Sequence, residues 1–358
     1  SITCQDGSAS ITQNDHRRGI DILLQRSIPV QFHGAFRLNI TITSSKANGL
    51  DMDQNQYGIL LQDQTGTQYA FRLHGQYYAL ERWDEKNEIL FNETYSPYLF
   101  SGEQENHIQF YCIEDSCDVV FNGQRSARYP LPLEGVSAVG IFAASDWDQR
   151  FGNVQFSTFT IEDRSASDDT TQPIHIIDDL HADRGRFTST TLSGAFNHFA
   201  EDGFHFSSLV PYGYYAAKSE PALANVSVSA VVQMDIDPSS SSSRYAGLVC
   251  RSSQDGMVMA VIRADGTYSI FRDTPRQPFA LLAERHSHAI RIGAVDNSLR
   301  LECNGDQINF SINGIQVESL TDTRYGLHFG RAGLYTKAGG EPDPDAIIFK
   351  DLVIEEER

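Results

Sequence analysis

The chain has 358 residues, of which 40% are hydrophobic and 21% are charged, and its formal net charge is −19 at pH 7. This length exceeds the size at which a single hydrophobic core usually stops growing, so two domains are expected. The acidic balance argues against nucleic acid as a partner, because such partners need clustered Lys and Arg, and the absence of a long apolar run predicts no membrane insertion.

The chain begins with SITCQDG, without a basic and apolar leader, as expected of a mature secreted protein. From Phe36 to Glu162, short segments alternate apolar and polar residues and are rich in Val, Ile, Phe and Tyr, the pattern of half-buried strands. Their sequences are AFRLNITIT, QYAFRLHGQYYALER, HIQFYC, DVVFNGQ and VQFSTFTIE. Asn122-Gly123 predicts a type I′ hairpin turn, and His74-Gly75 predicts another.

Residues 163–173 contain almost no apolar side chain, so we interpret them as a linker between a first domain, 1–162, and a second, 174–358. The second domain repeats the first. CNGDQINFSING, which ends at Gly314, follows CIEDSCDVVFNG, which ends at Gly123, by 191 residues, with Cys, Asp and Asn-Gly in the same places. This separation is far longer than a solenoid repeat and indicates a duplicated domain.

The same separation of 191 residues aligns Arg72 with Arg263 and Tyr77 with Tyr268. It also places Asp265-Gly266 over the His74-Gly75 turn. Earlier in the chain, AGLVCR follows YGILLQ by 189 residues, which predicts a two-residue insertion in the intervening turn. Since no segment shows a helical period with caps, we predict an all-β protein of two tandem antiparallel β-sandwich (jelly-roll) domains.

The order of these motifs resembles the concanavalin A-like lectin/glucanase superfamily, in particular the laminin G-like domains of bacterial extracellular proteins. In the second copy the resemblance rests on DDLHADRGRF, YAGLVCR, VIRADGTYSIFR, LRLECNGDQINFSING and FKDLVI. The first copy lacks the Asp-Asp-Leu opening, so its first strands must come from the unlike stretch Ser1 to Ser27. Members of this superfamily include enzymes, lectins and adhesion modules, so the fold alone does not choose a function.

The resemblance implies a disulfide between Cys250 and Cys303. In the first copy Leu61 stands at the place of Cys250, so Cys117 is the expected partner of Cys112. Such bonds are typical of secreted modules. The fifth cysteine, Cys4, is left as a buried thiol, a partner for another chain or an alternative partner for Cys112.

The resemblance also implies a structural calcium ion where the first and last strands of a domain meet. In the second copy it points to Asp178 or Asp179 together with Asp351. The alternative is that these acids cap turns.

Aromatic residues give the best indication of a ligand site. Both tryptophans, Trp83 and Trp147, lie in the first copy, and Trp83 follows Tyr78 and Arg72 in the same predicted hairpin. Aromatic rings beside polar groups are what sugar recognition uses. We therefore take Arg72, Tyr78, Trp83 and Trp147 as candidate ligand-binding residues, with surface tryptophans or an interdomain contact as the alternative.

Catalysis is not expected. Glucanases of the resembling superfamily place acids on alternate residues of one strand. The nearest match is VVQMDIDP, where Gln233, Asp235 and Asp237 alternate and the first position is an amide.

We predict a secreted or cell-surface, non-catalytic protein that binds a glycan or an extracellular protein, with the ligand site in the first copy and a more structural role for the second. The alternatives are a self-associating structural subunit of an extracellular filament or surface assembly and, third, a glycoside hydrolase.

Overall fold

The computed structural model describes most of the chain. The residues described are 2–5, 8–12, 24–32, 35–45, 55–83, 88–101, 104–113, 116–131, 135–145, 153–163, 173–184, 187–191, 195–208, 214–234, 244–253, 255–323, 327, 329–338 and 343–357. They divide between two compact units, Ser1–Thr171 and Gln172–Arg358. Within the described residues the regular elements are all strands, which confirms the all-β prediction.

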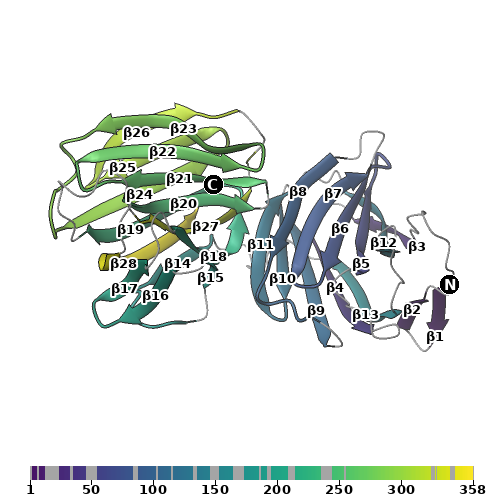
Figure 1. Ribbon diagram of the computed structural model, residues 1–358. Coiled ribbons are helices and arrows are strands. Elements are labelled where there is room, and N and C mark those ends of the chain that lie inside the picture. Colours follow the sequence, from purple (N-terminus) through teal and green to yellow (C-terminus); the bar gives the residue numbers. More distant parts are fainter. Residues whose placement is uncertain are drawn as a thin grey trace. The chain divides into compact units, whose positions relative to one another are not determined.

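The first unit is a sandwich of two antiparallel sheets (Figure 1). One sheet has the order β1-β2-β13-β4-β9-β10-β11, and the other has the order β3-β12-β5-β6-β7-β8. The strands are β1 (Ile2–Gln5), β2 (Ser8–Thr12), β3 (Leu24–Phe32), β4 (Phe36–Ser45), β5 (Asn55–Asp63), β6 (Gln68–His74), β7 (Tyr77–Trp83), β8 (Glu88–Tyr95), β9 (Glu105–Ile113), β10 (Ser116–Phe121), β11 (Gln124–Pro130), β12 (Val136–Ser145) and β13 (Asn153–Asp163).

The second unit repeats this arrangement. Its sheets have the orders β16-β17-β28-β19-β24-β25-β26, with β14 on β28, and β18-β27-β20-β21-β22-β23, with β15 on β18. The strands are β14 (His175–Asp178), β15 (Phe187–Thr191), β16 (Ala195–Ala200), β17 (Gly203–Ser208), β18 (Tyr214–Leu223), β19 (Val226–Met234), β20 (Tyr245–Ser253), β21 (Gly256–Ile262), β22 (Thr267–Thr274), β23 (Gln277–His286), β24 (Asp296–Asn304), β25 (Gln307–Ile312), β26 (Ile315–Thr321), β27 (Gly330–Lys337) and β28 (Asp343–Glu356).

Apart from β14 and β15, which have no counterpart among the described strands of the first unit, the two units have the same topology, which confirms the predicted tandem of jelly-roll sandwiches. The hairpin β1–β2 takes the place of β16–β17, and β3 takes the place of β18. The unlike first residues of the chain therefore supply the first strands of the first unit, as predicted.

Alternating burial explains why these segments form sandwich strands. In β9 the residues Asn106, Ile108, Phe110 and Cys112 point inward and are buried, and β24 shows the same alternation 191 residues later. Successive side chains of a strand point to opposite faces, so one face of each sheet is available for the core between the sheets. Most of the buried apolar residues of the second unit form one large cluster between its two sheets.

The repeated Asn-Gly pairs are type I′ turns, as predicted. Asn122 and Gly123 have φ values of 50° and 81°, and Asn313 and Gly314 have 51° and 78°. Both central residues of such a turn need positive φ, which Asn and Gly tolerate best.

Each turn asparagine also binds a second, buried asparagine. Asn122 donates to the side-chain oxygen of Asn106 over 3.1 Å, and Asn313 donates to that of Asn297 over 2.9 Å. The buried asparagine in turn pairs with both backbone groups of one loop residue, Phe100 in the first unit and Arg291 in the second. The repeat thus preserves a hydrogen-bond network around this hairpin as well as the turn.

Strand pairing corrects the alignment of the two copies before Cys112. Gly58 lies opposite Arg72, and Gly247 lies opposite Val261. The separation of 189 residues therefore continues through β6 and β21, without an insertion between β5 and β6. Arg72 corresponds to Val261, so its predicted match with Arg263 was wrong.

Compared with the first copy, the second copy has one extra residue in the turn between β21 and β22. Residues 75–76 form the turn between β6 and β7, whereas residues 264–266 form the turn between β21 and β22. In each turn a single glycine has positive φ, so the type I′ prediction was wrong for this hairpin. The extra residue makes Tyr78, not Tyr77, the counterpart of Tyr268. Both rings are buried, and both hydroxyls donate to a backbone carbonyl of the neighbouring sheet.

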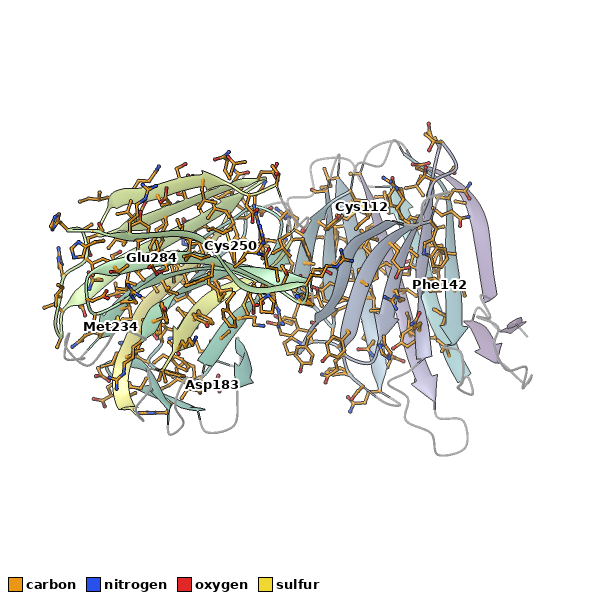
Figure 2. The ribbon with its side chains drawn as sticks, turned by 45° about the horizontal axis from the view of Figure 1, so that its top comes forward. Cys112, Phe142, Asp183, Met234, Cys250 and Glu284 are labelled. Carbon is orange, nitrogen blue, oxygen red and sulfur yellow. A yellow bond between two sulfur atoms is a disulfide. The ribbon has the colours of Figure 1, made fainter. Side chains whose placement is uncertain are left out.

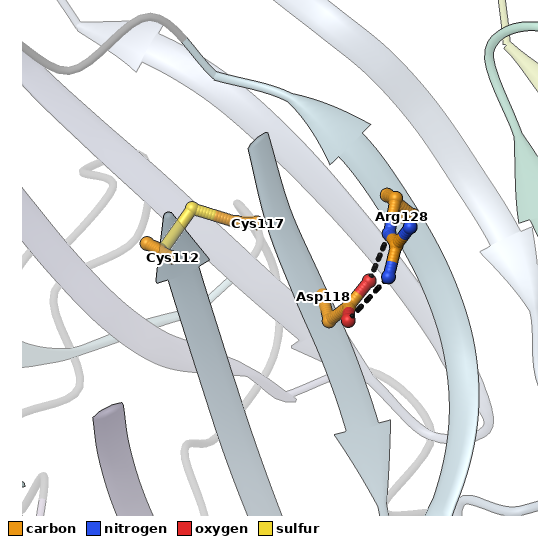
Figure 3. The surroundings of a disulfide bond; sticks show 4 residues. All are labelled: Cys112, Cys117, Asp118 and Arg128. Atoms are coloured by element: carbon orange, nitrogen blue, oxygen red, sulfur yellow. Dashed lines mark hydrogen bonds and ion pairs between the residues drawn. A yellow bond between two sulfur atoms is a disulfide. The ribbon is translucent and has the colours of Figure 1, made fainter. Parts of the chain in front are cut away.

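Both predicted disulfides form. Cys112 and Cys117 lie directly opposite each other on β9 and β10, with Cα atoms 4.0 Å apart (Figure 3). Cys250 on β20 and Cys303 on β24 join the two sheets of the second unit, and both are fully buried. Leu61 fills the place of Cys250 in the first core. Because Cys112 is bonded to Cys117, the alternative pairing of Cys4 with Cys112 was wrong.

A buried ion pair lies beside the first disulfide. Arg128 on β11 donates from Nε and Nη2 to the two carboxylate oxygens of Asp118 on β10, over 2.6 and 2.9 Å (Figure 3). Arg125 lies 3.2 Å from the same carboxylate. The fork geometry satisfies both oxygens of a carboxylate that is only 4% exposed.

Candidate functional site

The sheet β3-β12-β5-β6-β7-β8 has an outer face that carries three polar or aromatic residues close together. Arg72 lies opposite Gly58, Glu81 opposite Ala70, and Trp83 opposite Gln68. Side chains of directly opposed residues point to the same side of a sheet. Arg72, Glu81 and Trp83 therefore share the outer face, away from the core of the first unit.

These three side chains form a connected set, named here the Trp83 site. The indole Nε1 of Trp83 donates to Oε2 of Glu81 over 2.9 Å, and Nε of Arg72 lies 3.0 Å from Oε1 of the same carboxylate. The side chains of Arg72 and Glu81 are 14% and 19% exposed. One carboxylate thus fixes both the indole and the guanidinium.

The outer face is concave at the Trp83 site. The ring of Trp83 on β7 lies 5.3 Å from the ring of Phe142 on β12, edge to face; Phe142 is labelled in Figure 2. Two strands, β5 and β6, separate β7 from β12 in the sheet. Side chains this far apart can meet on one face only if the sheet curves toward that side.

Tyr78 does not belong to the Trp83 site, so this prediction was wrong. Its ring is 1% exposed and packs between Phe71 and Phe121 in the core, and its hydroxyl donates to the carbonyl of Ser126. Its neighbour Tyr77 points the other way and is 38% exposed. Side chains alternate between the two faces along a strand, so the sequence alone already indicates that Tyr78 faces away from Arg72 and Trp83.

The sequence interpretation also missed Glu81, which links Arg72 to Trp83. The signal was present, because Glu81 and Trp83 are two residues apart on one strand and so face the same side. Trp147 lies outside the described residues, so its predicted role stays a prediction.

The outer face of the corresponding sheet in the second unit is also aromatic, which the sequence interpretation did not anticipate. Val249, Met259 and Val261 are fully buried on this face, and the partly buried rings of Tyr245 and Phe271 pack against them. The centroids of these two rings are 5.8 Å apart. Aromatic residues therefore give no reason to confine ligand binding to the first copy.

The predicted calcium ligands are engaged by protein groups. Arg184 lies 3.2 Å from Oδ1 of Asp178 and 2.8 Å from Oδ2 of Asp179. The backbone N–H groups of Leu180 and His181 donate to the same two side chains, as residues that cap turns do. The hydrogen bond from His181, followed by that from Arg184, lowers the pKa of Asp179.

Asp351 is exposed and lies beside Leu352, the strand partner of Asp178. Within the described residues no group of three or more His, Cys, Asp or Glu side chains could hold a metal ion. Structural calcium therefore stays a prediction.

The strand that most resembles a catalytic one is β19. Gln233 lies on the outer face of its sheet, where its amide accepts a hydrogen bond from Lys350 over 3.2 Å. Its neighbours Val232 and Met234 are buried in the core. Asp235 and Asp237 lie outside the described residues.

No protein-family model and no curated protein matches this sequence. Among solved structures, a carbohydrate-binding module, CBM66, from Bacillus subtilis is 15% identical, covers 48% of this chain and 98% of its own, and has a TM-score of 0.38. Domains LG4-5 of the mouse laminin alpha1 chain are 9% identical and cover 99% and 91%, with a TM-score of 0.30. The apo Crh5 transglycosylase is 13% identical and covers 51% and 85%, with a TM-score of 0.37.

With identities and TM-scores this low, any assignment of function has to rest on the chain's own residues. The strand order of both units is that of an antiparallel jelly-roll sandwich, as predicted. Among the described residues, no helix is long and apolar enough to cross a membrane.

Proposed function

We propose that this chain is a non-catalytic carbohydrate-binding protein of an extracellular compartment, and that the Trp83 site contacts the sugar. The observation that carries the proposal is the fixed set of Arg72, Glu81 and Trp83 on a concave sheet face. An aromatic ring can cover the apolar side of a pyranose while neighbouring polar groups bind its hydroxyls. Because the three side chains already hold one another, little ordering would be needed on binding.

The chemistry of this face supports binding over hydrolysis. Glycoside hydrolysis generally needs two carboxyl groups on opposite sides of the scissile bond. Among the described side chains that point outward from β5, β6, β7 and β12, Glu81 is the sole carboxylate, and Arg72 and Trp83 both occupy it. The two disulfides support an oxidising, extracellular compartment.

The test is a glycan array probed with the whole chain, followed by calorimetric titration of the best ligand. We expect Trp83→Ala to weaken binding by about tenfold or more, because it removes the ring and leaves Glu81 without its indole donor. Tyr111→Ala is the matched control, since Tyr111 lies on β9 in the other sheet of the same unit and stacks with Arg37. It should leave the affinity unchanged.

Three outcomes would contradict the proposal. A folded Trp83→Ala variant with wild-type affinity would remove the site. Shorter sugars released from the bound glycan, detected by mass spectrometry, would favour a hydrolase. A silent array together with a polymeric mass in size-exclusion chromatography with light scattering would favour a structural subunit.

A further inference from the structure

A lysine of the second unit is held between two aromatic rings on the concave face of its sheet. The ammonium of Lys337, on β27, lies 5.8 Å from the ring centre of Tyr245 and 5.4 Å from that of Phe279. Both distances fall within the range of cation–π attraction. Lys337 is partly buried, and 38% of Phe279 is exposed, so the group is accessible from outside.

The geometry of this group requires a curved sheet. Phe279 belongs to β23, and three strands, β20, β21 and β22, separate β23 from β27. Phe279 has φ of 49°, a conformation that bulky residues rarely adopt, and its N–H donates to Oδ1 of Asp273 over 3.1 Å. This hydrogen bond helps to hold the ring over the face, opposite Lys337.

Among the residues that the structure describes, one cation of this group has no anionic partner. Arg263 also lies over Tyr245, at 5.9 Å, but it forms ion pairs with Asp265 at 3.3 Å and Glu284 at 3.7 Å; Glu284 is labelled in Figure 2. No carboxylate among the described residues lies within ion-pair distance of Lys337. The protein has a net charge of −19, so an ammonium with no described carboxylate beside it distinguishes this face.

We propose that this face binds a uronic acid unit of a polysaccharide, with the sugar ring against Tyr245 and Phe279 and its carboxylate at Lys337. One ammonium without an anionic partner among the described residues matches one carboxylate. The nearby carboxylates of Asp273 and Glu284 would repel a phosphate or a densely sulfated chain, and they can accept hydrogen bonds from sugar hydroxyls. This site lies in the second unit and does not depend on the Trp83 site.

The test compares acidic and neutral forms of the same sugar on the whole chain. Trisaccharides of galacturonate, glucuronate and mannuronate are titrated by calorimetry, each beside its methyl ester. We expect at least one acid to bind. Its methyl ester should bind at least about tenfold more weakly, and the affinity of the acid should fall with added salt. Equal affinity for acid and ester, or no saturation by any of the three acids, would overturn the proposal without any need for a variant.

Variants then locate the site. Lys337→Met and Phe279→Ala should each weaken binding of the acid by about tenfold, and Lys337→Arg should retain most of it. The matched control is Lys350→Met, because Lys350 lies on the other sheet of this unit, 3.0 Å from Asp296. Trp83→Ala should leave uronate binding unchanged, which separates this proposal from the proposed function. Wild-type affinity in a folded Lys337→Met variant would refute the assignment.

Discussion

At the scale of a single residue, Lys218 shows how burial couples the second unit to pH. Burial, together with the charge of Arg331, lowers the pKa of this amine from 10.5 to about 8. Below pH 8 the ammonium is charged in both the folded and the unfolded chain, and the folded state bears the full cost of burying it. Above pH 10.5 the amine is neutral in both states, so the cost vanishes.

We therefore expect Lys218→Met to raise the free energy of unfolding at pH 7 by up to about 3 kcal/mol, the free energy that corresponds to this change in pKa. The gain over the wild type should shrink as the pH rises from 8 and disappear above 10.5. Denaturant unfolding of both proteins between pH 7 and 11 measures the difference, in which the titration of other lysines cancels. A difference that is constant over this range would contradict the explanation.

At the scale of an element, the buried asparagine beside each Asn-Gly turn ties a hairpin to the loop that precedes it. Asn297 is 2% exposed and pairs with both backbone groups of Arg291 and with Asn313. Asn297→Ala would leave these groups buried without partners, so we expect a loss of about 2 to 3 kcal/mol in unfolding free energy.

The matched control for this change is Asn304→Ala. Asn304 is exposed on the same strand, β24, and its replacement should change the stability by no more than about 0.5 kcal/mol. Chemical denaturation of the two variants and the wild type gives both numbers. Equal effects of the two substitutions would show that the network adds nothing to the stability of the hairpin.

Local patterns in the sequence predicted the elements better than their register. The Asn-Gly pairs predicted two turns because the backbone conformation there depends on the two residues themselves. The length of the turn after β6 depends on the pairing of whole strands, which hid the extra residue before Tyr268 and produced the false match of Arg72 with Arg263. Tyr78 was misplaced for a different reason, since its side follows from simple alternation along the strand.

At the scale of the whole molecule, the repeat predicted two sandwiches, but it could not predict what the concave faces hold. Lys337 and Phe279 are separated by three strands in the sheet, and the curvature that brings them together is a property of the assembled sheet. The link of Trp83 to Phe142 across two strands has the same origin. The separation of such residues in the sequence does not predict that their side chains meet.

The composition of the second core makes a prediction about the units themselves. The large buried cluster between the sheets of the second unit consists of residues between Ile174 and Ile354, and the Cys250–Cys303 bond lies within it. A unit with its own core and its own disulfide should fold by itself. We expect the fragment 172–358 to unfold cooperatively, and its amide resonances in a two-dimensional NMR spectrum to overlay those of the same residues in the whole chain. A collapsed fragment without dispersed resonances would mean that the second unit needs the first to fold, and that the duplication produced one cooperative domain of double size.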